Sequence, residues 1–156
     1  MDLSEKLWAI EQIKQLKARY FRFMDTKDWV GLPTLFTADA QADYRLAMLD
    51  PADPVPPLET LAEHQLSGRD AVIHYIRSGL TPLVSVHKGY MGEVELAGTD
   101  TARGVWPMTD ELFMKEGPIR FIRGQGHYHE TYRIEDGAWR IATIRLTRLR
   151  LIMVAA

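Results

Sequence analysis

The sequence predicts a single α+β domain over residues 1–156, with helices packed on one face of a curved, mostly antiparallel sheet. In the first part of the chain, apolar residues recur every three or four positions, which is the helical period. From Leu83 onward the period becomes two, which indicates strands. The turn signals AGTD, KEGP and EDGA separate these strands by lengths that suit antiparallel hairpins.

Three helices are expected. The first covers residues 3–25, where one apolar stripe is made by Leu7, Ile10, Ile13, Leu16, Tyr20 and Met24. The second covers residues 28–36, shortened or kinked by Pro33, since proline removes a helical hydrogen bond. The third covers residues 68–80, with an inward face made by Val72, Ile73, Ile76 and Leu80.

The remaining segments are predicted as one connection and four strands. A short extended piece is expected over residues 41–49, and four prolines between positions 51 and 57 make residues 50–65 a stiff loop. The period of two predicts strands over residues 83–98, 101–115, 119–135 and 138–152.

Composition limits the function classes. The hydrophobic share of 46% and charged share of 26% are those of an ordinary globular domain. With 19 basic and 21 acidic side chains the net charge is −2, so binding of nucleic acid by phosphate neutralisation is not expected. Cysteine is absent, which excludes disulfides and thiolate catalysis. No apolar run approaches the ~18 residues of a membrane span and no signal peptide is recognisable. We therefore expect a cytoplasmic protein without a membrane or nucleic-acid partner.

Two charged residues break the strand pattern. Asp110 shares a face with the apolar residues Trp106, Met108, Leu112 and Met114. Arg148 shares a face with Ile144, Leu146 and Ile152. A charged side chain on a core face costs several kcal/mol unless it is paired with an opposite charge or faces a solvated cavity. Either the strands twist out so that both side chains reach solvent, or the two line the polar floor of an apolar pocket.

Asp25 and the histidines raise similar alternatives. Asp25 ends the first helix, where the helix dipole disfavours a carboxylate by roughly 0.3–1 kcal/mol. It either caps a following helix near Trp29 or has a partner elsewhere in the fold. His87 is a lone strand histidine, a kind that is usually structural. His127 and His129 share a strand face but lack a third ligand, so no metal site is predicted.

The ordered set MDTKDW, ADYR, SVHKG, WPMTD and DGAW resembles the scytalone dehydratase and SnoaL-like group. The resemblance covers roughly residues 5 to 150. It implies the cone-shaped, nuclear-transport-factor-2-like α+β fold and a site without metal or organic cofactor. It also implies a homo-oligomer, commonly a trimer.

The resemblance also implies roles for particular residues. Asp25 matches the family carboxylate that orients a histidine, and His87 matches that histidine, the general acid/base. Tyr44 is similar to the tyrosine that scytalone dehydratase directs at the substrate carbonyl. Tyr20 is similar to a catalytic tyrosine of the related bile acid 7α-dehydratase. Further residues are expected to bind substrate: Asp110, Arg148, Tyr128, Met24, Trp106 and Met108.

Departures from the family pattern make scytalone itself an unexpected substrate. Met24 replaces the tyrosine that precedes the family aspartate, and Gly126 and Tyr128 replace polar strand residues. The second pocket histidine has no clear counterpart, and Asp110 lies near its place.

These residues together predict a cofactor-independent lyase. A carboxylate beside His87 would hold one ring nitrogen protonated and leave the other free as a base. That base would remove the proton α to a carbonyl of a small hydrophobic hydroxy-carbonyl compound. The protonated histidine, or Asp110 if it is neutral, would then give a proton to the departing hydroxyl, and water would leave. The alternatives are a ketosteroid-type isomerase, a dehydrohalogenase, a subunit of a ring-hydroxylating dioxygenase, or a non-catalytic binding module of the same fold.

Overall fold

The computed structural model describes residues 1–156 and contains one strongly curved, open sheet of seven strands. Along the sheet the order is β2-β1-β7-β6-β5-β3, and β4 pairs with β5 beside β3. The strands are β1 Phe36–Asp43, β2 Gln65–Ser67, β3 Leu83–Gly89, β4 Glu93–Leu96, β5 Thr101–Met114, β6 Ile119–Glu135 and β7 Ala138–Ala155. Only the pairing of β1 with β7 is parallel, so the predicted mostly antiparallel sheet is confirmed.

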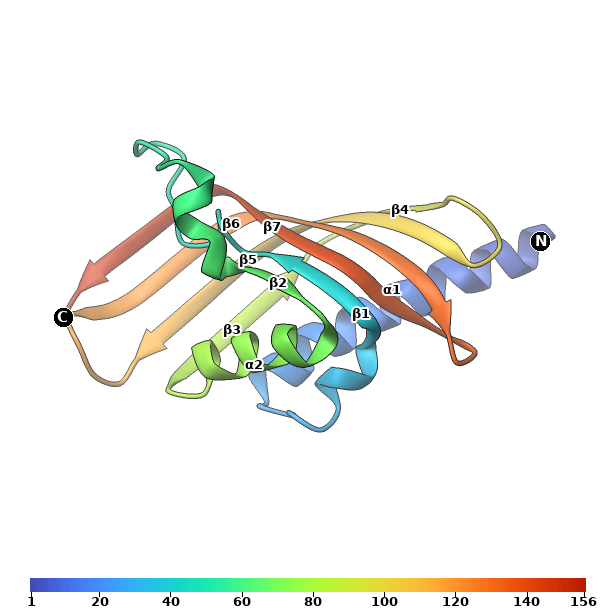
Figure 1. Cartoon of the computed structure of the whole chain (residues 1–156), viewed down its shortest axis with the longest axis horizontal. Helices are drawn as coiled ribbons and strands as arrows, with labels where there is room; N and C mark the ends of the chain where they lie inside the picture. Colours follow the sequence, from blue (N-terminus) through green and yellow to red (C-terminus); the bar gives the residue numbers. More distant parts are fainter.

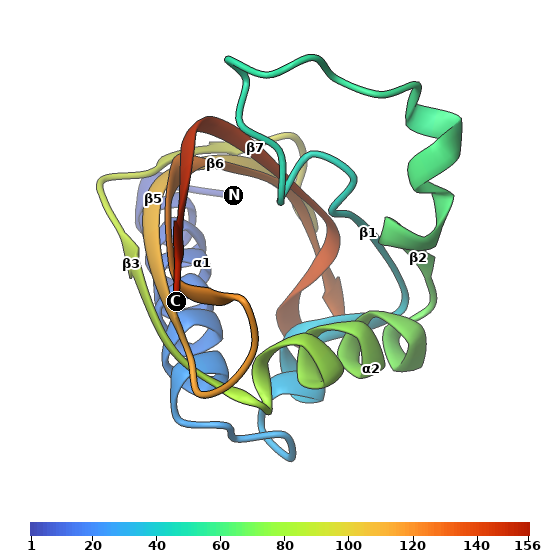
Figure 2. The same ribbon diagram turned by 90° about the vertical axis from the view of Figure 1, so that its left-hand side faces the viewer.

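Helix α1, Leu3–Asp25, lies along the long strands inside the curve of the sheet (Figures 1 and 2). A capping box starts it, because the Asp2 carboxylate accepts from the Glu5 amide at 2.9 Å and the Glu5 carboxylate accepts from the Asp2 amide at 2.6 Å. The predicted stripe is buried from Ile13 to Met24. Leu7, however, is 59% exposed, because α1 extends beyond the sheet at its N-terminal end (Figure 1).

Helix α2, Arg69–Leu80, covers the opening that the curved sheet leaves between β1 and β3 (Figure 2). Val72 and Ile76 are buried on its inner face, and Ile73 and Leu80 are partly buried against the same core. Helices on one face of a curved sheet therefore form the predicted α+β cone.

The chain between α1 and α2 differs from the sequence prediction. No second α-helix forms over 28–36; only a short 3-10 helix, η1 (Leu32–Leu35), is present, with Pro33 in its first turn. The extended segment is β1, which begins at Phe36 and ends at Asp43, so residues 44–49 are turns rather than strand. The proline-rich connection is not entirely irregular, because it contains η2 (Leu58–His64) and the short strand β2.

The first predicted strand is divided into β3 and β4. Tyr90 donates its amide to the Pro107 carbonyl at 2.9 Å, but Pro107 has no amide with which to complete the pair. The register between the strands then shifts by one residue, from Gly89 opposite Met108 to Glu93 opposite Val105.

The last strand changes face at a bulge. Gly126 pairs with Arg148, whereas Gln125 pairs with Arg150, so Leu149 is the additional residue. After this bulge the parity reverses: Leu151 is buried and Ile152 is 44% exposed. The prediction that Ile152 shares the inner face with Arg148 was therefore wrong.

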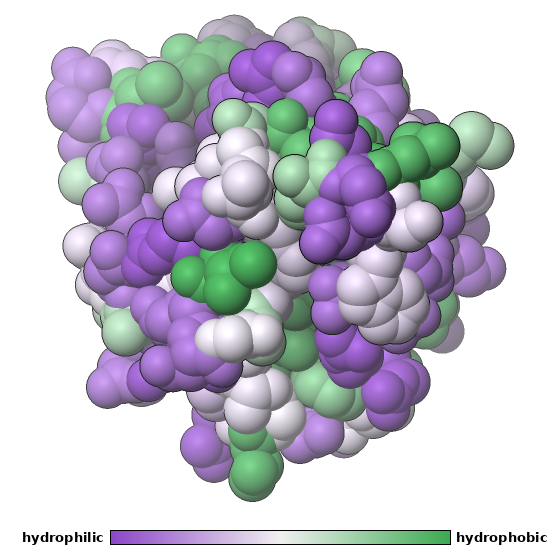
Figure 3. Space-filling view, turned by 90° about the vertical axis from the view of Figure 1, so that its right-hand side faces the viewer, coloured by the Kyte–Doolittle hydropathy of each residue, from purple (hydrophilic) through white to green (hydrophobic).

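Hydrophobic side chains on the molecular face that includes the start of α1 occur in small patches between polar groups (Figure 3). The main core is continuous and comprises side chains of both α-helices, η1 and the inner face of the sheet. None of the helices combines the length and the apolar character that a bilayer crossing requires.

Close packing at the break between β3 and β4 gives a stability prediction. A Cβ on Gly92 would lie 2.2 Å from the Trp106 ring, so Gly92→Ala should lower the free energy of unfolding by about 1–3 kcal/mol. Gly79, in α2, has no atom within 4 Å of such a Cβ, and Gly79→Ala should raise it by about 0.5–1 kcal/mol. Urea unfolding of both variants measures the difference. Equal stability would contradict the packing assigned to Gly92.

Candidate active site

The Asp25 carboxylate holds His87 by two hydrogen bonds. Asp25 is the last residue of α1, and His87 lies 62 positions later, on β3. The Asp25 Oδ1–His87 Nδ1 distance is 2.6 Å, and the His87 amide donates to Asp25 Oδ2 at 2.6 Å. Ser85 Oγ donates to Asp25 Oδ1 at 3.0 Å. No helix begins at Trp29, so the alternative in which Asp25 caps a following helix is wrong, and the partners of Asp25 lie on β3.

The turn after α1 fixes the position of this carboxylate. Thr26 donates its amide to Arg22, and Lys27 adopts a left-handed conformation with φ 59°. The Lys27 ammonium then donates to the Leu80 carbonyl at 2.7 Å, which ties the turn to the end of α2. Lys27 was not predicted, although the motif MDTKDW contains it.

The interaction with Asp25 determines which His87 nitrogen is free. Nδ1 faces the carboxylate and is therefore the protonated nitrogen of the neutral ring. Nε2 lies on the opposite side, 4.0 Å from Asp110 Oδ2. The Phe21 ring stacks on the imidazole with a centroid distance of 6.4 Å, and the His87 side chain is only 5% exposed. Nε2 is therefore the nitrogen available as a base.

Asp110 and Arg148 form a buried bidentate ion pair. Their two hydrogen bonds measure 2.8 and 2.9 Å, and Arg148 Nε donates to the Ala47 carbonyl at 2.7 Å. The side chains are 4% and 2% exposed, so the alternative in which the strands twist out to solvent is wrong. A Cβ on Gly124 would lie 2.2 Å from the guanidinium and 2.3 Å from the carboxylate. Glycine at this position therefore leaves room for the pair.

Three buried tyrosines lie beside the ion pair. The hydroxyls of Tyr20 and Tyr44 are 3.4 Å apart, and the Tyr20 and Tyr128 rings meet edge to face at 5.6 Å. Burial raises the pKa of all three phenols, and the charge of Asp110 raises the pKa of Tyr128 further. The three therefore keep their protons at neutral pH and can donate hydrogen bonds.

Tyr44 has support that the sequence interpretation missed. Its ring stacks on Tyr75 of α2, with centroids 5.3 Å apart and an interplanar angle of 2°. The Tyr75 hydroxyl lies 2.7 Å from His64 Nδ1, at the end of the proline-rich connection. Tyr75 follows the buried Val72 by three positions and adjoins Ile76, so the helical period placed it beside the buried face, and that spacing was the available signal.

A second buried ion pair was also missed. The Lys17 ammonium contacts the Glu130 carboxylate, which also accepts a hydrogen bond from the Tyr132 hydroxyl. The Trp106 indole donates to that hydroxyl at 2.7 Å. Lys17 lies four positions after Ile13, on the buried face of α1, and that spacing was the available signal.

The other predicted binding residues are buried in different places. Met108 contacts the Arg148 guanidinium through its sulfur at 3.6 Å, and Met24 belongs to the main core. Trp106 points toward Tyr132 rather than toward His87. The structure thus brings Asp25, His87, Asp110 and Arg148 together, with the three tyrosines beside them, and places Trp106 apart. That any of these residues binds substrate stays a prediction.

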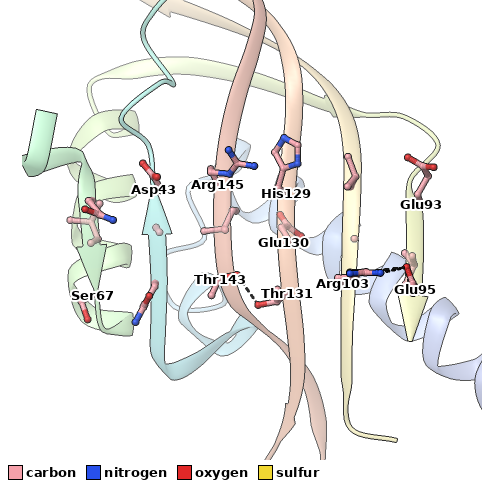
Figure 4. Close-up of a pocket in the computed structure, with 18 residues that line it drawn as sticks. Asp43, Ser67, Glu93, Glu95, Arg103, His129, Glu130, Thr131, Thr143 and Arg145 are labelled. Carbon is pink, nitrogen blue, oxygen red and sulfur yellow. Dashed lines mark hydrogen bonds and ion pairs between the residues drawn. The ribbon is translucent and has the colours of Figure 1, made fainter. Parts of the chain in front are cut away.

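A hollow of about 860 Å³ lies elsewhere, across β2, β1, β7, β6, β5 and β4 (Figure 4). It contains none of the predicted site residues. His129 lines it beside Arg145, and burial and that arginine lower the His129 pKa. The His127 and His129 rings are 6.3 Å apart, and no third histidine or carboxylate completes a metal cluster with them.

Known structures with the same fold cover nearly the whole chain. A putative scytalone dehydratase from Novosphingobium aromaticivorans is 15% identical with a TM-score of 0.79, over 99% of this chain and 93% of that one. A hexachlorocyclohexane dehydrochlorinase from Novosphingobium barchaimii is 14% identical with a TM-score of 0.78, over 98% and 94%. A protein of unknown function from Mycobacterium tuberculosis is 24% identical with a TM-score of 0.72, over 95% and 76%. At these identities the likeness establishes the fold.

The sequence itself matches a family. The profile described as a SnoaL-like domain matches residues 5–145, nearly the full α+β cone from α1 into β7. The resemblance inferred from the motifs is therefore confirmed, and the chain belongs to the SnoaL-like family.

Proposed function

We propose that this protein is a cofactor-independent lyase that eliminates water from a hydrophobic hydroxy-carbonyl compound. The single observation that carries the proposal is that Asp25 forms hydrogen bonds with both the ring and the backbone amide of His87. It fixes the tautomer and the ring orientation before any substrate arrives, as a general base requires. Family membership and the two named relatives, a putative dehydratase and a dehydrochlorinase, support an elimination.

In this proposal His87 Nε2 removes the proton α to the substrate carbonyl. The electrons of the broken C–H bond form an enolate, whose oxygen accepts a hydrogen bond from Tyr44 or Tyr20. The C–O bond then breaks, a conjugated carbon–carbon double bond forms, and the protonated histidine gives its proton to the departing hydroxyl. Asp110 is not the proton donor, because both of its oxygens already accept from Arg148.

The same proposal includes a homotrimer, a cytoplasmic location and a small hydrophobic substrate. Light scattering of the purified chain would measure the oligomer directly. Incubation with a panel of cyclic hydroxy-ketones, followed by mass spectrometry, tests the reaction class, because elimination releases water and isomerisation leaves the mass unchanged.

The base assignment predicts that His87→Ala lowers kcat by about 10²–10⁴-fold. The folded state should persist, since the ring is one of several contacts between α1 and β3. His74→Ala, a matched change at an exposed position on α2, should leave kcat unchanged. Turnover and far-ultraviolet circular dichroism of both variants check this. Full activity in the His87 variant would end the assignment.

The tautomer assignment gives a separate prediction. Asp25→Asn keeps the shape of the side chain, but its amide no longer requires a proton on Nδ1, so the wrong tautomer becomes available. We expect a loss in kcat of about 10²–10⁴-fold with little change in KM. Steady-state kinetics measure both parameters. If Asp25→Asn retains wild-type kcat, the carboxylate has a structural role only.

The Asp110–Arg148 pair predicts a dependence on guanidinium geometry. Arg148→Lys keeps the charge but cannot bond both Asp110 oxygens and the Ala47 carbonyl together. We expect a loss of about 1–3 kcal/mol in the free energy of unfolding and a lower kcat. Arg150→Lys, at an exposed arginine that pairs with Asp50, is the control and should change stability by less than about 0.5 kcal/mol. Urea unfolding that finds the two variants equally stable would refute this role.

A further inference from the structure

The Lys17 ammonium lies against the faces of three aromatic rings. Its Nζ is 3.6 Å from the centroid of Tyr128, 4.2 Å from that of Tyr20 and 4.7 Å from that of Phe21. The side chain is 1% exposed. Tyr20 and Phe21 follow Lys17 by three and four positions on α1, so one turn of helix presents all three to Tyr128 on β6. An ammonium against a ring face is attracted by the negative potential of that face.

Stability alone gives a weak reason for this arrangement. A buried ion pair such as Lys17–Glu130 costs several kcal/mol of desolvation per charge, and apolar pairs of similar volume are often as stable. The pair is nevertheless fully supported, because Tyr132 donates to Glu130 and Trp106 donates to Tyr132. The arrangement thus keeps an ammonium, together with its Glu130 counter-charge, at a fixed place in the interior.

That charge lies directly behind two phenols of the candidate site. The ring faces of Tyr20 and Tyr128 contact the ammonium. The Tyr20 hydroxyl lies 3.4 Å from that of Tyr44. Tyr128 lies close enough to Asp110 for the Asp110 charge to raise the Tyr128 pKa. A phenol that donates to an oxyanion accumulates negative charge. An ammonium against the ring faces stabilises that negative charge. The Glu130 carboxylate, whose charge raises the pKa of Tyr44, offsets part of the effect on the side of Tyr44.

We propose that Lys17 is a positioning residue that makes Tyr20 and Tyr128 stronger hydrogen-bond donors toward a substrate oxygen that becomes negative. The inference rests on the proposed function and deepens it, since it specifies a substrate whose reacting intermediate is a delocalised oxyanion, of the enolate or phenolate class. The site then prefers such an anion to a neutral compound of the same shape. Phe21, which contacts both Lys17 and His87, completes the apolar surroundings of the ammonium.

A pair of probes that differ in charge but hardly in size tests this preference. Pentafluorophenol, which is ionised at neutral pH, represents the anion, and hexafluorobenzene represents the neutral compound. Binding of each to the full chain is followed by fluorine NMR at pH 7. The double variant Lys17→Met/Glu130→Gln removes both buried charges at similar volume, so it should fold.

We expect the double variant to bind pentafluorophenolate about 2- to 30-fold more weakly than wild type, the range of a cation–π contact, and to bind hexafluorobenzene equally well. An equal loss of affinity for both probes, or no loss of affinity for either, would overturn the inference. Lys17 and Glu130 would then have a structural role only. Failure of the wild-type protein to prefer the anion would do the same.

A second measurement does not depend on the folding of that variant. Burial lowers the pKa of Lys17 to about 8, and the groups that face it are Glu130 and the phenols of Tyr20 and Tyr128, whose own pKa values are raised. The wild-type preference for the phenolate should therefore fall as the pH rises through about 8. Lys17→Arg, which stays charged, should keep it across this range. The same pH dependence in both proteins would count against Lys17.

These binding readouts are independent of turnover. If His87→Ala proves fully active while the anion preference depends on Lys17, the proposed lyase mechanism fails and the oxyanion site stands. If turnover depends on His87 but the preference for the anionic probe is unchanged when Lys17 is replaced, the mechanism stands and this inference fails.

Discussion

The carboxylate of Asp25 is the contact on which the rest of the site depends. It accepts hydrogen bonds from the His87 amide, the His87 ring and the Ser85 hydroxyl, so it joins the end of α1 to β3. A carboxylate with three donors at a partly buried position is strongly held. Rotation of the imidazole would break its own bond to Asp25, while the bonds from the His87 amide and the Ser85 hydroxyl would still join α1 to β3. The same carboxylate therefore orients His87 and holds the end of α1 against the sheet.

Around this contact, the interior holds two further buried ion pairs, each beside one or more of the tyrosines. Asp110–Arg148 lies over Gly124 beside His87, and Lys17–Glu130 lies behind the phenols. Every buried side-chain polar atom in the structure has a partner. Fully satisfied networks of this kind are rigid and keep their dipoles oriented, which is the property that electrostatic catalysis needs. The hollow across the strands of the sheet is lined by none of Asp25, His87, Asp110 and Arg148, although Glu130 is among its lining residues (Figure 4).

The sequence predicted much of the fold and failed at identifiable residues. Proline interrupted regular hydrogen bonding in two places: Pro33 limited the second helix to a 3-10 turn, and Pro107 divided the first strand. The bulge at Leu149 reversed the parity of β7. Pattern reasoning counts positions along one strand, whereas a bulge is decided by the neighbouring strand, so Ile152 was assigned to the wrong face.

By itself the sequence determined the α+β class, the long antiparallel strands, the placement of Asp110 and Arg148 on otherwise apolar strand faces, and the family. Each of these follows from local periodicity or from an ordered set of motifs. Only the tertiary structure decided that Asp25 reaches β3 rather than a following helix. It also decided that Asp110 is buried in a pair with Arg148, and that Lys17 pairs with Glu130. The reason is physical: these pairs join residues 38 to 113 positions apart, and chain spacing carries no information on which distant charges meet once the sheet curves around α1.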